Sequence, residues 1–446
     1  MRFMFKAGLV LLLLQAAVIQ GATIVTNLAA GYENSLFLKP GGSLWGMGYN
    51  GYGQLGVGTL NSTNRPEQIL ATNVFAVACG DQHSLLLKTN GSLWVMGYNG
   101  DGELGDGTFN TAVRPKQILA SNVTAIACGV FHSLLIKTNG SLWAMGYNGD
   151  GELGDGTFNT TNKPEQIVSS GVVAIASRGF HSLFLKSDGS LWGMGYNGDG
   201  ELGDGTFNTT NRPEQIVPGN VVAMAGGNYH SLFLKSDGSL WAMGYNYFGE
   251  LGDGTFNSAN QPEQIVSSNV VAIACGGYHS LFVKSDGSLW AMGYNGDGEL
   301  GDGTFSNTNR PEQIVSSGVI AVVAGERHSL FVKSDGCVWG MGADDYGELG
   351  DGFNSSAALV EQISPLPRPF LTSGLSSATD LQFAATCQFA GTFYLLTSTN
   401  ITQPLSQWSP VWTNSVTDRG ANNFNATLLN SVSPNVRQRF YILQSK

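Results

Sequence analysis

The sequence of 446 residues is poor in charged side chains, and the charges that it has are unbalanced. Only 12% of the residues are Asp, Glu, Lys or Arg, and the formal net charge is −11. No run of basic residues interrupts this acidity. Nucleic acids and anionic membrane surfaces attract proteins through clustered Lys and Arg. The composition therefore argues against both as partners.

Cysteines and catalytic motifs are also scarce. The five cysteines show none of the regular spacing of a disulfide-stapled domain. Cys79, Cys128 and Cys275 share one repeat position that other copies fill with Ser, Gly or Ala, so this position needs a small side chain. The chain contains no G-x-S-x-G, no H-E-x-x-H and no phosphate-binding loop. We therefore expect a protein that is not an enzyme, with no catalytic residues, no metal site and no cofactor.

A long apolar run occurs only at the N-terminus. Arg2 and Lys6 precede an apolar stretch from Ala7 to Ile19, which is followed by small and polar residues. A positive start, a short apolar core and a polar end are typical of a secretory signal peptide. We predict a signal peptide over residues 1–22 and no membrane insertion after its cleavage. The expected location is secreted or at the cell surface, with the periplasm as an alternative.

Repetition is what the sequence has in abundance. Seven tryptophans recur every 49 residues, at Trp45, Trp94, Trp143, Trp192, Trp241, Trp290 and Trp339. Six histidines keep the same interval, at His83, His132, His181, His230, His279 and His328, and Asn34 takes the corresponding place in the first copy. A period of this length indicates a repeat architecture in which each copy packs against its neighbours.

Each copy predicts four short strands. VVAIACG, HSLFVK and SLWAMG are β-prone apolar runs separated by Gly, Asn and Asp. The segments SDG and TNG predict a tight hairpin, because Asp-Gly and Asn-Gly tolerate positive φ. PEQIV, with its proline, fits a fourth strand at an outer edge. Since SLWAMG is apolar on both faces, each sheet must be covered on both faces, as the blades of a propeller are.

The combined motifs are specific. HSLFLKSDGSLWGMGYNGDGELGDG, with PEQIV downstream and VVAIACG upstream, resembles the repeat of the regulator of chromosome condensation family. The resemblance implies a seven-bladed β-propeller, which we predict for residues 23–366. Asn34, Val57 and Ala343 depart from the repeat, as expected near the seam where the ring closes.

Residues 370–446 lack the period. TDLQFAATC, GTFYLLTSTN and RQRFYILQ read as strands, so we predict a small β-sandwich-like module, which resembles modules at the C-termini of secreted bacterial proteins. The predicted fold class is all-β: a seven-bladed β-propeller of 49-residue repeats followed by a small β-sandwich-like domain.

The repeated loop NGDGELGDG allows two interpretations. As a calcium loop it would use the oxygens of Asn99, Asp101, Glu103 and Asp106. An EF-hand register, however, needs glycine where Leu104 stands and an acid where Asn110 stands. Gln54 replaces the glutamate in the first copy, so the carboxylate is dispensable. We favour a structural turn in which Asn holds backbone groups. The histidines are likewise expected to be structural, each satisfying a backbone group at the start of its strand.

The dipeptide before each His-Ser is among the least repetitive positions and is rich in aromatic residues. It lies on the turn between the first and second strands, at the same end of the blade as the acidic loops. Aromatic side chains at turn tips are typical of recognition surfaces, although rim residues also vary freely. The candidate partner-binding residues are Tyr32, Phe131, Phe180, Tyr229, Tyr278 and Arg327.

These features favour an exported, monomeric, non-catalytic binding scaffold whose propeller face recognises a protein partner. The family resemblance implies one alternative, guanine-nucleotide exchange on a Ran-like GTPase, because the family includes exchange factors as well as a secreted inhibitor of β-lactamases. A carbohydrate-binding or hydrolytic surface protein is another alternative, since acids are plentiful although no pair of them stands out.

Overall fold

A computed structural model describes residues 27–364 and six further strands, at 370–375, 381–387, 391–398, 409–416, 422–428 and 440–445. The predicted signal peptide lies outside these residues. Among the helices of the described residues, none is long and apolar enough to cross a membrane. The chain divides into two compact units. The first comprises residues 1–350 and 354–363, and the second comprises 351–353 and 364–446.

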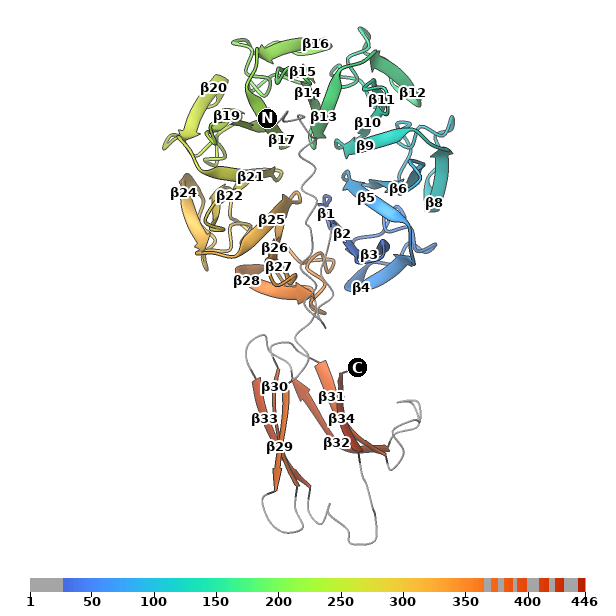
Figure 1. The fold of residues 1–446 in the computed structure, drawn as a ribbon, viewed down its shortest axis with the longest axis vertical. Helices are drawn as coiled ribbons and strands as arrows, with labels where there is room; N and C mark the ends of the chain where they lie inside the picture. Colours follow the sequence, from blue (N-terminus) through green and yellow to red (C-terminus); the bar gives the residue numbers. More distant parts are fainter. Residues whose placement is uncertain are drawn as a thin grey trace, which may run out of the picture. The chain divides into compact units, whose positions relative to one another are not determined.

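The first unit is a ring of seven four-stranded antiparallel blades (Figure 1). Blade 1 consists of β1 (Asn27–Ala30), β2 (Asn34–Lys39), β3 (Ser43–Gly48) and β4 (Thr63–Leu70). Blade 2 consists of β5 (Val74–Cys79), β6 (His83–Lys88), β7 (Leu93–Gly97) and β8 (Ala112–Leu119). Blade 3 consists of β9 (Val123–Cys128), β10 (His132–Lys137), β11 (Leu142–Gly146) and β12 (Thr161–Val168). Blade 4 consists of β13 (Val172–Ser177), β14 (His181–Lys186), β15 (Leu191–Gly195) and β16 (Thr210–Val217).

The remaining three blades repeat this arrangement. Blade 5 consists of β17 (Val221–Gly226), β18 (His230–Lys235), β19 (Leu240–Gly244) and β20 (Ala259–Val266). Blade 6 consists of β21 (Val270–Cys275), β22 (His279–Lys284), β23 (Leu289–Gly293) and β24 (Thr308–Val315). Blade 7 consists of β25 (Val319–Ala324), β26 (His328–Lys333), β27 (Val338–Gly342) and β28 (Ala357–Ser364). Each blade runs in chain order from the axis outwards, which confirms the predicted seven-bladed propeller.

The turns follow from local sequence. At the hairpin between β14 and β15, Gly189 adopts φ +79°, and its N–H donates to the Lys186 carbonyl at 2.9 Å. Asp188 keeps a negative φ, unlike the Asp-Gly hairpin that we predicted, and its Oδ1 instead accepts from the Ser190 N–H at 2.9 Å. The link from one blade to the next needs one left-handed residue, and Asn or Gly supplies it. These residues are Asn73, Asn122, Gly171, Asn220, Asn269 and Gly318.

The hydrophobic core lies between neighbouring blades. In one cluster, Leu232 and Leu251 of blade 5 pack with Phe282 and Met292 of blade 6, and all four are fully buried. Leu251 comes from the GELG loop, so this loop plugs the space between two sheets. Trp290 is only partly buried and lies under the Lys284 ammonium, which is 4.0 Å from its ring centroid. The methionines thus form the core, while the tryptophans cover its edge.

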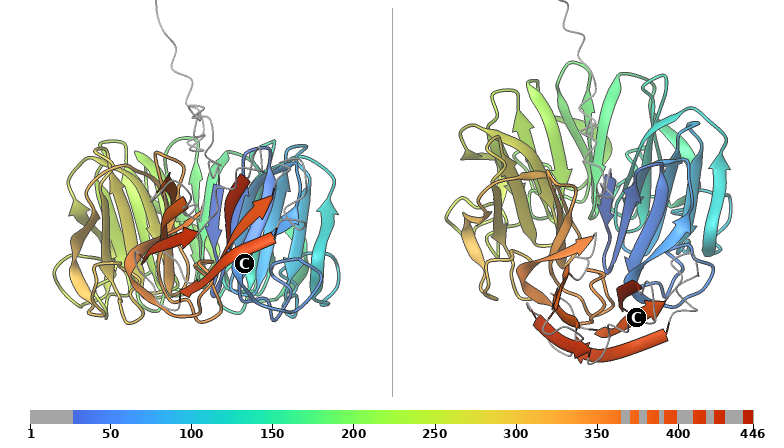
Figure 2. Two further views of the ribbon diagram at one scale, coloured as in Figure 1. Left: turned by 90° about the horizontal axis from the view of Figure 1, so that it is seen from below. Right: turned by 60° about the horizontal axis from the view of Figure 1, so that its bottom comes forward.

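The ring closes without exchange of strands, because blades 1 and 7 each take all four strands from one repeat. Viewed from the side, the blades have loops at both ends of their strands (Figure 2). His328 Nε2 of blade 7 lies 2.9 Å from Ser35 Oγ of blade 1. Ser35 Oγ in turn donates to the Glu348 carbonyl of blade 7 at 2.8 Å. Packing and these side-chain bonds therefore hold the closure.

The second unit contains two antiparallel sheets. One has the order β29 (Phe370–Leu375), β30 (Leu381–Cys387) and β33 (Asn422–Leu428). The other has the order β32 (Ser409–Val416), β31 (Gly391–Ser398) and β34 (Phe440–Ser445). Strand content in both units confirms the all-β fold class.

Candidate protein-binding face

The variable turns stand on a ring of His–Ser hydrogen bonds between consecutive blades. Each histidine Nε2 lies 2.8–2.9 Å from the Oγ of the serine that is the second residue of the next blade's second strand. At the junction of blades 2 and 3, Ser133 Oγ donates its one hydrogen to the Glu103 carbonyl at 2.8 Å. The hydroxyl must therefore accept from an Nε2–H of His83. Burial lowers the pKa of His83 to about 4, so this histidine is neutral at pH 7.

This ring corrects one expectation. The histidines bind serine hydroxyls rather than backbone groups, because the strand ends already pair through contacts such as Gly80 N–H to the His83 carbonyl at 2.9 Å. Between blades 1 and 2, where Asn34 replaces the histidine, Asn34 Nδ2 lies 3.7 Å from the Cys79 sulfur.

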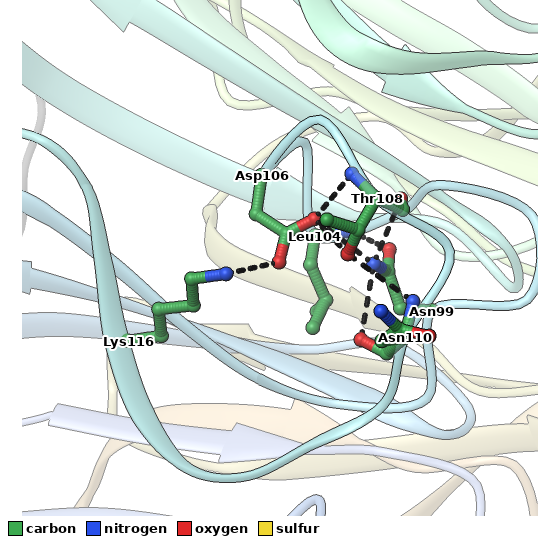
Figure 3. Close-up of polar contacts among 6 residues, drawn as sticks. All are labelled: Asn99, Leu104, Asp106, Thr108, Asn110 and Lys116. Atoms are coloured by element: carbon green, nitrogen blue, oxygen red, sulfur yellow. Dashed lines mark hydrogen bonds and ion pairs between the residues drawn. The ribbon is translucent and has the colours of Figure 1, made fainter.

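The acidic loop uses its polar side chains on its own backbone (Figure 3). Asn99 Oδ1 accepts from the Leu104 N–H at 2.9 Å, and Asn99 Nδ2 donates to the Thr108 and Asn110 carbonyls at 3.1 and 3.2 Å. Asp106 Oδ1 accepts from the Thr108 N–H at 2.8 Å, and its other oxygen pairs with the Lys116 ammonium. These bonds support the interpretation of the loop as a structural turn.

The loop glutamates form a second ring of buried groups. Glu201 is fully buried; its Oε2 accepts from the Asp199 N–H at 3.0 Å, while its Oε1 has no hydrogen-bond partner in the part of the chain that the structure describes. Burial raises the pKa of Glu201 to about 8. Glu103, Glu152, Glu250, Glu299 and Glu348 repeat the geometry, and burial raises their pKa values to about 7 or 8. Gln54 holds this place in blade 1, and its Oε1 accepts from the Tyr52 N–H at 3.1 Å. A neutral side chain therefore suffices here.

Removal of divalent cations is expected to leave the melting temperature unchanged. Within residues 27–363, no three His, Cys, Asp or Glu side chains gather as metal ligands, and the loop carboxylates already accept backbone hydrogen bonds. Scanning calorimetry with and without EDTA measures this directly. A rise of several degrees with calcium, lost when Asp101, Asp150 and Asp199 are changed to Asn, would show that the loops bind the ion.

Four of the six predicted binding residues form a continuous arc on one face, the aromatic crescent: Phe131, Phe180, Tyr229 and Tyr278. Consecutive ring centroids lie 6.4, 5.9 and 5.9 Å apart across blades 3 to 6. None of the four is fully buried. Such distances are typical of aromatic pairs in contact. The crescent is thus one surface rather than four separate tips.

Tyrosines of the acidic loops extend the aromatic crescent outwards. The Tyr245 ring lies 6.1 Å from Tyr229 and 6.2 Å from Tyr278. Phe248, in the one loop that reads NYFGE, lies 5.7 Å from Tyr278. The acidic residues Asp101, Asp150 and Asp199 belong to the same loops, and burial raises the pKa of each. Turns and acidic loops therefore share this face, as predicted.

The other two predicted residues do not join the aromatic crescent. Arg327 donates from Nε to Asp297 Oδ2 at 2.8 Å and lies 3.8 Å from Asp345, so it belongs to an ion-pair network. Tyr32, with 36% exposure, occupies the first rather than the second position of its dipeptide. At this first position side chains point inwards to the propeller axis, where the structure shows a feature that we did not predict.

That feature is a polar group at the end of the propeller axis, the axial cluster, which consists of Tyr32, Asp81, Arg178, Asn228 and Glu326. Glu33, at the second position of its dipeptide, lies close enough to interact electrostatically with Asp81 and Glu326. Arg178 is 6% exposed and reaches from blade 4 across the ring. It donates to the carbonyls of Ala30 at 3.1 Å, Gly31 at 3.2 Å and Ala324 at 3.3 Å, in blades 1 and 7. Below it, a channel of about 260 Å³ is lined by the first strands of all seven blades. The signal was present in the sequence, because the six other copies have Gly where Arg178 stands.

Acids surround this arginine. Glu326 Oε2 lies 3.6 Å from Arg178, and both Glu326 oxygens accept from Asn228 Nδ2, at 2.8 and 2.6 Å. Asp81 makes no hydrogen bond within the described residues, and burial followed by the charge of Glu326 raises its pKa well above the usual range. Burial raises the pKa of Glu33 to about 7. The cluster therefore holds more carboxyl groups than Arg178 alone neutralises.

The cysteines behave as the sequence predicts. Cys79, Cys128 and Cys275 are free, buried and part of the channel wall. Burial raises the pKa of Cys79 to about 12, so its thiol stays protonated and unreactive.

An apolar feature of the outer loops was missed. One large side chain per loop is more than half exposed in blades 1 to 6: Leu60, Phe109, Phe158, Phe207, Phe256 and Phe305. The repeated phenylalanine of GDGTFN marks this position in the sequence, although the pattern there predicts only a turn.

Comparison with protein families confirms the resemblance inferred from the repeat. The family described as RCC1-like domain matches residues 13–267. The regulator of chromosome condensation (RCC1) repeat matches residues 270–299, 319–348 and 286–332. A search of curated proteins finds no match.

Solved structures share the fold. Human WBSCR16 is 26% identical over 70% of this chain and 87% of its own, with a TM-score of 0.63. Prp20p from Saccharomyces cerevisiae is 20% identical over 79% of this chain and 90% of its own, with a TM-score of 0.64. In its complex with Kap60, yeast RCC1 (Prp20) is 21% identical over 84% of this chain and 93% of its own, with a TM-score of 0.65.

Proposed function

This chain belongs to the family of RCC1-like domains, and we propose that it is an exported, non-catalytic scaffold that binds a protein partner on the face bearing the aromatic crescent. The continuity of the four rings carries this proposal. They stand at positions that are among the least repetitive, whereas the frame beneath them is nearly identical from blade to blade. A repeat protein whose turn tips vary on a nearly constant frame is built to present those tips.

The chemistry of the face supports a protein partner. Partly exposed Phe and Tyr side chains are the residue types that dominate interface energetics, and they lie beside acidic loops that would steer a basic surface towards them. The net charge of −11 disfavours nucleic acid. Among proteins with the same fold, Prp20p is described as binding Gsp1p and histones and is seen with Kap60, so protein partners are in character for the fold.

The test is the double change Phe131→Ala, Phe180→Ala in the full chain. Truncating a central aromatic anchor often costs about 2 kcal/mol, or about thirtyfold in affinity. We therefore expect the variant to lose most capture of partner from the native environment while it keeps the wild-type melting temperature, because neither ring lies in the core. Capture by the immobilised chain identifies the partner, and biolayer interferometry then measures its affinity.

The matched control is Asp188→Asn with Asp237→Asn on the hairpins at the opposite end. Asn90 and Asn139 occupy these places in blades 2 and 3 and accept the same serine hydrogen bonds, so the change preserves the turns. Loss of binding in this control with retention in the aromatic variant would assign the partner to the other face. A captured GTPase would favour the exchange activity over a simple scaffold.

A further inference from the structure

We propose that the axial cluster receives one cationic side chain, an arginine or a lysine, from the protein bound to this face. The inference rests on the proposed function, because a protein partner would deliver the cation. It adds a charged contact at the axis to the aromatic contacts of blades 3 to 6.

The balance of charges points to a cation. Two carboxyl groups, Asp81 and Glu326, share the cluster with Arg178, and Glu33 interacts electrostatically with both of them. Arg178 forms its ion pair with Glu326 and donates from Nη1 and Nη2 to backbone carbonyls, while its Nε makes no hydrogen bond within the described residues. Arg327 pairs with Asp297 and Asp345, and its charge also acts on Glu33. Within the described residues, neither Asp81 nor Glu33 forms an ion pair.

An unpartnered acceptor points to a hydrogen-bond donor in the same place. Asn228 is 6% exposed, and its amide lies in the cluster because Nδ2 donates to both oxygens of Glu326. Its Oδ1 accepts no hydrogen bond from any described residue. A buried acceptor without a donor costs free energy, which an incoming N–H would recover. Arginine and lysine both supply such donors together with positive charge.

Aromatic rings stand beside the carboxylates. Burial raises the pKa of Tyr32 and of Tyr229, and the charges of Asp81 and Glu326 contribute to both shifts, so both rings lie within the field of these acids. A cation next to carboxylates and aromatic rings gains from both. Tyr229 also belongs to the aromatic crescent, so a partner that covers the crescent brings its side chains to the axis.

Short peptides test the site apart from the natural partner. We expect the full chain to bind acetyl-Gly-Arg-Gly-amide, with a saturable shift of the Asn228 side-chain amide signals in NMR spectra. The citrulline peptide, which has almost the same shape without the charge, should cause no such shift. Asp81→Asn should weaken binding of the arginine peptide by about tenfold, as loss of a charged hydrogen-bond partner does. Asp188→Asn, an equal change of charge on a hairpin at the opposite end of the propeller, should leave it unchanged.

The outcomes separate this inference from the proposed function. Equal shifts with arginine and citrulline, or undiminished binding by both Asp81→Asn and Glu33→Gln, would overturn the cation site. If the Phe131→Ala, Phe180→Ala variant still loses its partner in that case, the proposed function stands alone. Specific binding of the arginine peptide, with unchanged partner capture by the aromatic variant, would retain the cation site and remove the aromatic crescent from the interface.

Discussion

Replacing Arg178 by methionine is expected to lower the free energy of unfolding by about 3–5 kcal/mol, the cost of breaking a buried ion pair from one side. The change leaves Glu326, which is 7% exposed, without its positive partner and next to Asp81. It also removes the hydrogen bonds that tie blade 4 to blades 1 and 7 across the axis. Methionine keeps a flexible apolar side chain of similar length. The lost stability therefore comes mainly from the missing charge and hydrogen bonds and less from a change in side-chain volume. Urea unfolding at pH 7 measures it.

Two further variants test whether the lost stability comes from the ion pair. Adding Glu326→Gln to Arg178→Met should recover part of the loss, because the uncompensated carboxylate is then gone, and the double-mutant cycle should show a coupling of about 1–3 kcal/mol. Arg327→Met removes an arginine whose side chain is 35% exposed and paired with Asp297, so it should cost under about 1 kcal/mol. Equal losses from Arg178→Met and Arg327→Met would mean that the axial ion pair does not stabilise the ring.

The repeat made the architecture predictable, since a strict period of 49 residues leaves few ways to place strands of the same length. The repeat also predicted which face carries the candidate site. Two loops separated by an even number of antiparallel strands lie at the same end of a blade. The contact between Arg327 and Asp297 joins a first turn to an acidic loop of the neighbouring blade and agrees with that count.

The repeat could not predict which side chains meet at the propeller axis. Arg178 bonds to Ala30, 148 residues away in sequence, only because blade 4 stands opposite the closure of the ring. A pattern that treats copies as equivalent cannot show which residues meet across a circle. Tyr32 was grouped with the crescent because it is aromatic, but it sits one position earlier and faces the axis with the acids. The partner of each histidine was missed because Ser133 and its equivalents belong to the next copy.

The pH dependence of stability should reflect the two rings of buried titratable groups. Burial lowers the histidine pKa values to about 3 or 4 in blades 2 to 5 and 7, so these side chains stabilise the fold above their unfolded value of about 6.5, and this stability is lost as the pH falls. The loop glutamates have the opposite sign. Their pKa values of about 7 to 8 exceed the unfolded value, so stability is greatest at low pH and falls as the pH rises to about 8. Stability should therefore be greatest between about pH 4.5 and 6.5, not at neutral pH.

The triple change Glu152→Gln, Glu201→Gln, Glu250→Gln isolates the glutamate ring. Each tenfold difference in proton affinity between folded and unfolded states is worth about 1.4 kcal/mol, so one such difference per residue gives a gain of about 4 kcal/mol at pH 9. Near pH 5 the gain should vanish, because the wild-type carboxyls are already neutral in the folded protein, and Gln54 shows that an amide fits the loop. Urea unfolding from pH 4.5 to 9 measures the gain both where it should vanish and where it should be largest. Changing the exposed Glu67, Glu165 and Glu312 to Gln is the matched control and should give no comparable gain at pH 9. A gain for the buried triple variant that is the same at pH 5 and pH 9 would show that these loops hold their glutamates in the charged form.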